Sequence, residues 1–152
     1  MSAIESFARK EPSSGITYLR NGVIVAFFIA KPVHEISDCL LELLDKFVQG
    51  IPPAALKWAV TSATGEEWKE MDDRTIQRLK TSLAPAGSRK RKLTAFRLND
   101  SGLDAPGYSF ELVGRPNDVD LPDAVTLVQM TFPLTALQEE NIASFVSQAR
   151  GF

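Results

Sequence analysis

The stretch GVIVAFFIAKPVHEISDCLLELLDKFVQG, residues 22–50, decides the fold because it places a strand and a helix in direct succession. Its first nine residues are apolar on both faces and rich in β-branched and aromatic types, a pattern typical of a central strand covered on both sides. Pro32 then ends the strand. From Glu35 to Gln49 apolar residues recur with the period of a helix, and Gly50 stands where a C-cap belongs.

Outward from this unit, the chain shows further strand and helix patterns. Alternating apolar runs bounded by Gly, Pro, Asn or Asp predict strands at residues 56–60, 92–98, 108–113 and 124–132. Helical periods predict helices up to about Leu83, capped by Asp72 or Asp73, and at about residues 135–148. The run Tyr108 to Val113 alternates apolar with polar residues, which indicates a sheet with one wet face and antiparallel pairing.

These elements predict an α+β fold, with a mixed or mainly antiparallel five-stranded sheet and about three helices packed on it. The polar residues 1–20 are predicted to form a flexible N-terminal arm, and residues 21–152 a single α+β domain. The chain of 152 residues, with 44% hydrophobic and 24% charged residues, has the balance of a soluble globular protein.

Composition also excludes several classes of protein. The longest apolar run, residues 23–30, is far shorter than the roughly 20 residues of a membrane span, and no secretory signal is evident, so no membrane association and a cytoplasmic location are expected. The single cysteine suits a reducing compartment. A net charge of −2 lacks the basic excess of a nucleic-acid binder, and RKRK, residues 89–92, is interpreted as a charge run that keeps a strand end soluble.

The residues offer little for catalysis. His34 and Cys39, the sole residues of their types, are five positions apart and so lie on different faces of a helix. We interpret them as a helix-start histidine and a buried thiol. Zinc needs three or four ligands, and the turn Asp118 to Asp123 lacks the glycine and glutamate of a calcium loop, so no metal and no cofactor are expected. The sequence predicts a protein that is not an enzyme.

One charge pattern suggests a binding surface. Glu35, Asp38, Glu42 and Asp45 are spaced to share one helix face, where like charges repel. The simplest interpretation is a solvated face without a role. The alternative is a docking surface for a basic protein partner, formed by these four residues together with Asp118 and Asp120.

Three stretches, NGVIVAFFIAKPVHEI, ALKWAVTSATGEEWKEMDD and GYSFELVGR, together resemble the type VI secretion immunity proteins, the TsiV-like group long described as a domain of unknown function. The resemblance covers about residue 22 to the last helix. Typical members continue beyond the point that corresponds to Phe152. The matching positions are Phe27, Phe28, Pro32, His34, Leu56, Lys57, Trp58, Gly65, Trp68, Gly107, Tyr108 and Phe110.

The resemblance implies a cytoplasmic immunity protein that binds and neutralises a cognate bacterial effector toxin by occlusion, without catalysis. Two alternatives stay open. One is a small-molecule-binding domain or enzyme with a site between sheet and helices, lined by Tyr108, Trp58 or His34. The other is a subunit that forms a homodimer through the exposed edge of its sheet or its last helix. The toxin's activity and the docking surface are not encoded in any recognisable motif.

Overall fold

The computed structural model describes residues 8–61, 67–89, 93–116 and 123–149. Its main sheet has six strands in the order β3-β8-β7-β6-β4-β5, and every neighbouring pair is antiparallel. The predicted α+β class is confirmed, whereas the predicted count of five strands is wrong by one. The strands are β3 (Gly22–Ile29), β4 (Trp58–Thr61), β5 (Lys69–Glu70), β6 (Thr94–Asn99), β7 (Ser109–Gly114) and β8 (Thr126–Pro133).

The additional strand is β5, which pairs with β4 over two residues only. Its neighbour Met71 extends the pairing, because the Met71 N–H donates to the Lys57 carbonyl oxygen at 2.8 Å. Two charged residues, Lys69 and Glu70, carry none of the apolar alternation by which a strand is recognised. This strand could therefore not be predicted from the sequence pattern.

The prediction that the first strand of residues 22–50 lies in the centre of the sheet is wrong. β3 lies at the edge of the sheet and pairs only with β8 among the described strands. On one face of β3, Ile24 and Phe28 are 61% and 76% exposed. An apolar run on both faces is compatible with double burial, but burial also requires enough other elements to cover both faces, and the described helices cover only one.

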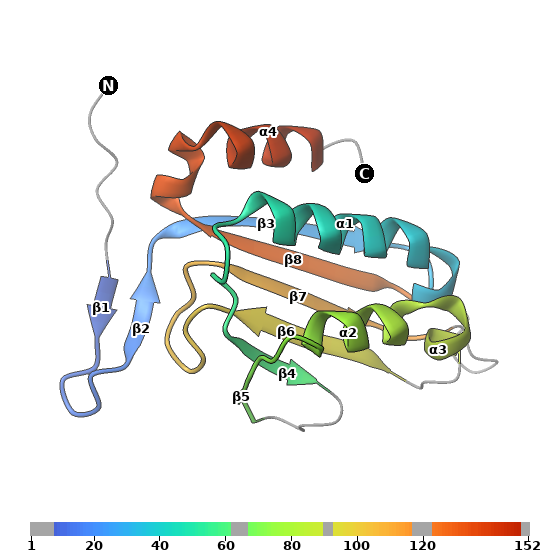
Figure 1. Cartoon of the computed structure of the whole chain (residues 1–152), viewed down its shortest axis with the longest axis horizontal. Coiled ribbons are helices and arrows are strands. Elements are labelled where there is room, and N and C mark those ends of the chain that lie inside the picture. The colour runs from blue at the N-terminus through green and yellow to red at the C-terminus, as the bar shows by residue number, and fades with distance from the viewer. Residues whose placement is uncertain (1–7, 62–66, 90–92, 117–122, 150–152) are drawn as a thin grey trace.

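Residues 8–20, assigned from the sequence to a flexible arm, form a hairpin of β1 (Ala8–Lys10) and β2 (Thr17–Arg20). This hairpin is a separate two-stranded sheet at one end of the molecule (Figure 1). The backbone N–H of Ala105, in the β6–β7 loop, donates to the Thr17 carbonyl oxygen at 2.6 Å. The flexibility of the arm stays a prediction.

The helices lie where the sequence places them, with altered boundaries. The first begins with a 3₁₀ turn, η1 (Val33–Glu35), followed by α1 (Ser37–Gly50), so Gly50 is the last helical residue rather than the cap. The last predicted helix is likewise divided, into the 3₁₀ helix η2 (Leu134–Gln138) and the α-helix α4 (Glu140–Ala149). A short helix, α3 (Pro85–Arg89), also forms where the sequence predicts a loop. The remaining described helix is α2 (Thr75–Leu83).

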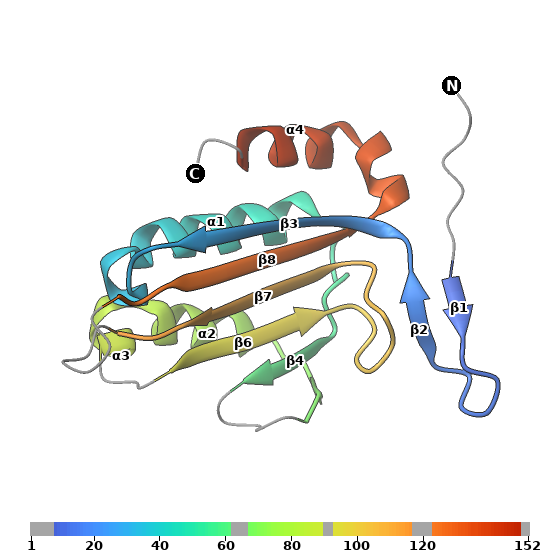
Figure 2. The same ribbon diagram turned by 180° about the vertical axis from the view of Figure 1, so that it is seen from behind.

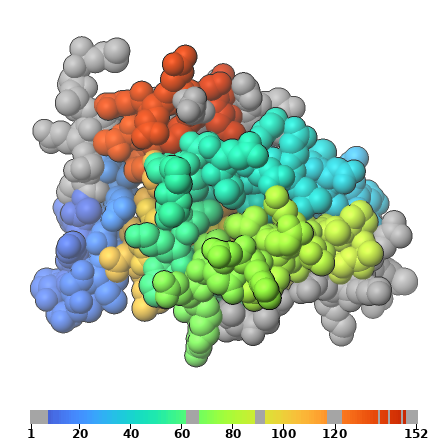
Figure 3. Space-filling view, viewed as in Figure 1, coloured from blue at the N-terminus to red at the C-terminus, as the bar shows by residue number. Residues whose placement is uncertain are grey.

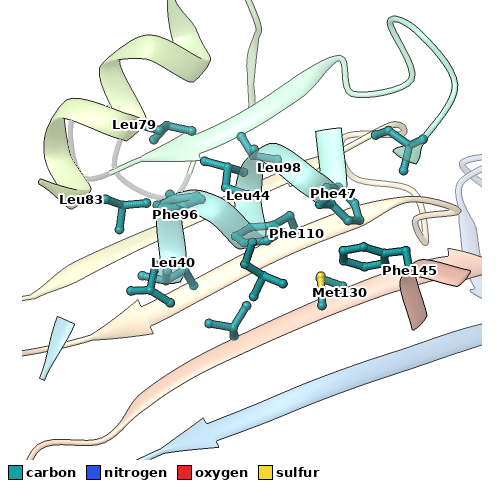
Figure 4. Close-up of a cluster of buried hydrophobic side chains, with 14 of the residues drawn as sticks. Leu40, Leu44, Phe47, Leu79, Leu83, Phe96, Leu98, Phe110, Met130 and Phe145 are labelled. Atoms are coloured by element: carbon teal, nitrogen blue, oxygen red, sulfur yellow. The ribbon is translucent and has the colours of Figure 1, made fainter. Parts of the chain in front are cut away.

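The helices α1 and α2 cover one face of the main sheet, and α4 lies beside β3 (Figures 1 and 3). Between them and the sheet lies a core built around phenylalanine rings (Figure 4). The ring of Phe47 on α1 lies 5.4 Å from Phe110 on β7 and 5.6 Å from Phe132 on β8, measured between centroids. Phe96 stacks on Phe110, and Phe145 of α4 lies 5.9 Å from Phe132. These contacts join three strands and two helices into one packed layer.

Candidate interaction surfaces

The four predicted acidic residues of the first helix do not form one equivalent stripe. Glu35 belongs to η1, and Asp38 to the first turn of α1; both are exposed. Neither forms an ion pair with another described residue. An acidic residue near a helix N-terminus is favoured by the helix dipole, so Asp38 is stable without a cation.

The other two acidic residues are neutralised within the chain. Glu42 pairs with Lys46 one turn further along α1, with 2.9 Å between carboxylate oxygen and Nζ. Asp45 pairs with Lys80 of α2, a contact between helices that the sequence did not reveal. The charge left for a basic partner is therefore concentrated at Glu35 and Asp38. The other two predicted residues, Asp118 and Asp120, lie outside the described residues.

His34 and Cys39 form no site together. His34 lies half-buried in η1, and its Nδ1 is buried without a hydrogen-bond partner among the described residues. The prediction of a histidine at the helix entrance is confirmed. Cys39 lies in the first turn of α1 and is exposed, so the predicted burial of its thiol is wrong. The inward positions of this helix are taken instead by larger side chains, namely Leu40, Leu43, Leu44 and Phe47.

The proposed lining of an interior ligand site does not converge. Strand pairing places Trp58 and Tyr108 toward one end of the sheet, through Trp58 opposite Asn99 and Asn99 opposite Ser109. His34 follows the opposite end, beyond Ile29. Between these ends, the side chains of the aromatic core fill the layer under α1 (Figure 4).

The phenol of Tyr108 has a raised pKa. Partial burial raises the pKa of its phenol above the ordinary value, and the nearby carboxylates of Glu139 and Asp100 raise it further. The ring packs edge-on against Phe132, with 6.4 Å between centroids. Asp100 has a structural task, because its carboxylate accepts the backbone N–H groups of Gly107 and Tyr108 at 3.0 and 3.1 Å and so closes the β6–β7 loop.

A shallow hollow at the start of α2 is lined by Asp72, Asp73, Arg74 and Arg78. Asp72 pairs with Arg78 and accepts the Arg74 N–H at 2.9 Å. These contacts, first the hydrogen bond from Arg78, lower the pKa of Asp72. The charged groups of this hollow thus contact one another and the first turn of α2. The N-cap of α2 is Arg74, which makes no side-chain cap hydrogen bond, so the predicted cap at Asp72 or Asp73 is wrong. In the described part of the chain, no cluster of three or more His, Cys, Asp or Glu side chains could hold a metal ion.

A further surface is the face of the main sheet opposite the helices, here called the open face. Figure 2 views the sheet from behind, with β3, β8, β7 and β6 in front of α1 and α2. Pairing registers arrange its side chains in three rows across the strands. The rows are Phe28, Leu127, Val113 and Ala95; then Ala26, Gln129, Glu111, Arg97 and Val60; then Ile24, Thr131, Ser109, Asn99 and Trp58, a row in which Ser109 and Asn99 are buried.

The open face has an apolar end and a charged centre. At the apolar end, Phe28 is 76% and Val113 40% exposed. Two further exposed apolar residues, Leu93 and Val125, precede β6 and β8 at this same end. In the central row Arg97 of β6 lies directly opposite Glu111 of β7. Exposed apolar side chains grouped beside polar ones are characteristic of protein-binding surfaces.

The sequence did not identify the open face as a site, although it contained two signals for it. One was the alternation of Tyr108 to Val113, which predicted a wet face and is confirmed by the exposure of Val113. The other was the ratio of elements, since about three helices cannot cover both faces of a wide sheet. Which apolar residues of Gly22–Ile29 would be exposed depended on the pairing partner of this strand.

In the described part of the chain, none of the helices combines the length and apolar content needed to cross a membrane. No protein-family model matches the sequence, and no curated protein matches it. The fold is similar to that of a solved structure, the Pseudomonas aeruginosa T6SS protein PA0821, with a TM-score of 0.63 and 15% sequence identity. The match covers 86% of this chain and 39% of that chain, so this chain spans about two fifths of its length. At this identity the likeness shows a shared fold.

Proposed function

We propose that this chain is an immunity protein of a type VI secretion system, which binds a cognate effector toxin and blocks it by occlusion, without catalysis. The observation that carries the proposal is the open face, where exposed apolar residues such as Phe28 and Val113 lie beside Arg97 and Glu111. Occlusion requires a complementary surface and no reactive group. The cytoplasmic location predicted from the sequence is part of the proposal.

The fold comparison supports the association with this secretion system. The similar structure is described as a T6SS protein, and its fold extends over most of this chain. The stretches that resemble immunity proteins contribute Phe28 to the open face and Trp58 to its opposite end. The fold comparison therefore supports association with a type VI secretion system, and the sequence resemblance supports the immunity role within it.

Within this proposal, the open face supplies the contact and the acidic residues guide association. Glu35 and Asp38 form no ion pair with the described residues, so their field acts on an approaching basic surface. Glu42 and Asp45 contribute less, because Lys46 and Lys80 neutralise them. Asp118 and Asp120 stay part of the proposed acidic surface. Charges of this kind change the association rate more than the affinity.

Co-expression tests the proposal directly. Each gene adjacent to that of this chain is expressed in bacteria with and without it, and growth is measured. We expect one neighbour to be toxic alone and harmless with this chain, and the two products to co-purify. Failure of every toxic neighbour to be rescued would remove the proposal, as would rescue without a stable complex.

A matched pair of variants locates the contact. Val113→Lys places a charge in the apolar end of the open face, and should weaken toxin binding at least about tenfold, which is about 1.4 kcal/mol. Leu103→Lys is the control, because Leu103 is 76% exposed but lies in the β6–β7 loop. Equal effects of the two variants, measured by calorimetry on the purified complex, would show that the open face is not the contact. A separate Glu35→Lys and Asp38→Lys variant should lower the association rate.

A further inference from the structure

The two edges of the main sheet differ in how they are protected against another strand. At one edge, β5 has only two residues, Lys69 and Glu70, both exposed and charged. Short length and charge are the devices that prevent edge-to-edge pairing. At the other edge, β3 presents eight residues without charge or proline, and no described strand pairs with its outer side. The β3 edge thus has neither the short length nor the charge that protects the β5 edge.

Side-chain alternation limits how a second strand can pair with β3. Gly22, Ile24, Ala26 and Phe28 point to the open face, and the residues between them point toward the helices. In an antiparallel pair, residues directly opposite each other lie on the same face. Two copies of β3 can therefore match even-numbered positions only with even-numbered positions, which leaves few registers.

The register centred on Ala26 is self-complementary. It places Ile24 opposite Phe28 of the second copy, twice, with the small Ala26 facing its own equivalent on the symmetry axis. Aromatic residues opposite β-branched residues are favourable cross-strand pairs. A register centred on Val25 would instead place Phe28 opposite Gly22 of the second copy and lose both pairs.

The charges that flank β3 are compatible with this register. Arg20 would lie opposite Pro32 of the second copy, and Lys31 opposite its Asn21. No two like charges are directly opposite, so the arrangement avoids the repulsion that disfavours such pairs. The centre of the contact, Gly22 to Ile29, is free of charge in both copies.

The surface available is sufficient for a reversible dimer. A fully buried phenylalanine covers about 150–250 Å², so Phe28, at 76% exposure, offers about 150 Å². Ile24 at 61% exposure offers about 100 Å² on the same basis. The paired backbone and the other side chains of the strand add about as much again, giving about 500 Å² per copy and about 1,000 Å² in total. This is near the lower limit for a specific complex.

We propose that two copies of this chain pair antiparallel through β3, centred on Ala26, and form one continuous twelve-stranded sheet. Because even positions face even positions, both open faces lie on the same side of that sheet and all helices on the other. The area predicts a dissociation constant in the micromolar range, roughly 1–100 µM. The proposal concerns self-association and does not depend on the identity of the toxin.

Sedimentation of the full chain between about 1 and 500 µM, a range that brackets that constant, tests the proposal. We expect a monomer–dimer equilibrium that Phe28→Lys weakens at least about tenfold, because the variant places a cation opposite Ile24. Val113→Lys, on the same face but away from the edge, is the control and should leave the equilibrium unchanged. A monomer at every concentration would overturn the proposal, as would an equal effect of the two variants.

A cysteine crosslink tests the register. In a Cys39→Ser background, Ala26→Cys places two thiols on the symmetry axis, where Cβ atoms of an antiparallel pair are about 4.5–5.5 Å apart, close to disulfide geometry. Rapid disulfide formation is expected for Ala26→Cys and not for Ala95→Cys, which lies on β6 in the interior of the sheet. Crosslinking through position 95 but not through 26 would overturn the proposal, as would a dimer that forms no crosslink at 26.

Discussion

The substitution Gly114→Ala is expected to disrupt the corner at which the first strand of the main sheet turns into its helix. Gly114 ends β7, and a Cβ atom added there would lie 2.4 Å from Cγ2 of Val33 in η1 and 2.8 Å from Oγ1 of Thr126. Ordinary carbon–carbon contacts are about 3.5–4.0 Å. Val33 and Thr126 are 1% and 0% exposed, so neither side chain can turn outward into solvent.

The magnitude follows from overpacking and from one hydrogen bond. Inserting a methyl group into a filled site costs about 1–3 kcal/mol. The Thr126 hydroxyl donates to the Lys31 carbonyl oxygen at 2.8 Å, and displacing it would add about 0.5–1.5 kcal/mol. We therefore expect the free energy of unfolding to fall by about 2–4 kcal/mol, which lowers Tm by about 4–16 °C for a domain of this size.

Urea and thermal unfolding monitored by circular dichroism measure the effect. Gly50→Ala is the matched control, because a Cβ at Gly50 would meet no atom within 4 Å, and alanine in a helix is favoured over glycine by up to about 0.5–1 kcal/mol. The two glycine-to-alanine changes should thus have opposite signs. A Gly114→Ala protein as stable as the unmodified chain would refute the close packing of η1 on β7.

Three further substitutions probe the core and the titrating groups. Phe110→Ala, at a residue that is 0% exposed between two ring neighbours, should cost about 3–5 kcal/mol in urea unfolding. Tyr108→Phe should reduce the loss of stability at alkaline pH. The raised pKa of Tyr108 means that its contribution is complete below the ordinary value of 10.0 and is lost as pH rises through the folded pKa. Asp72→Asn should destabilise the chain above pH 3.8, the ordinary value, and the difference should shrink as pH falls through the lowered pKa, because Arg78 and the helix start stabilise the carboxylate.

Each of these expectations has a contrary result. A loss below 1 kcal/mol for Phe110→Ala would contradict the tight aromatic packing. If stability fell equally with alkaline pH in the Tyr108→Phe variant and in the unmodified chain, the pKa of Tyr108 would not be raised by folding. A constant difference between Asp72→Asn and the unmodified chain across the acidic range would assign the effect to something other than the charge of Asp72.

The sequence by itself determined the class of fold and most of the elements, because apolar periodicity is a local property. The 3.6-residue stripe predicted a helix with five inward residues, Ile36, Leu40, Leu43, Leu44 and Phe47; the last four are buried on α1, and Ile36 is half-buried at its N-cap. The alternation around Phe110 predicted an antiparallel strand with one wet face. The five-residue spacing of His34 and Cys39 predicted that they do not form a local pair. The structure places His34 in η1 and an exposed Cys39 in α1.

The tertiary structure decided what depends on residues far apart in the chain. Only strand order places β3 at an edge, since an apolar strand has the same pattern whether one neighbour pairs with it or two. Only the position of the helices on one face of the sheet leaves Ile24 and Phe28 exposed on the other. Only the packing of α2 beside α1 brings Lys80 to Asp45 and neutralises that residue of the predicted acidic stripe. Local pattern specifies which side chains prefer burial, but long-range contact decides which of them are covered, and the surfaces available for binding are what remains.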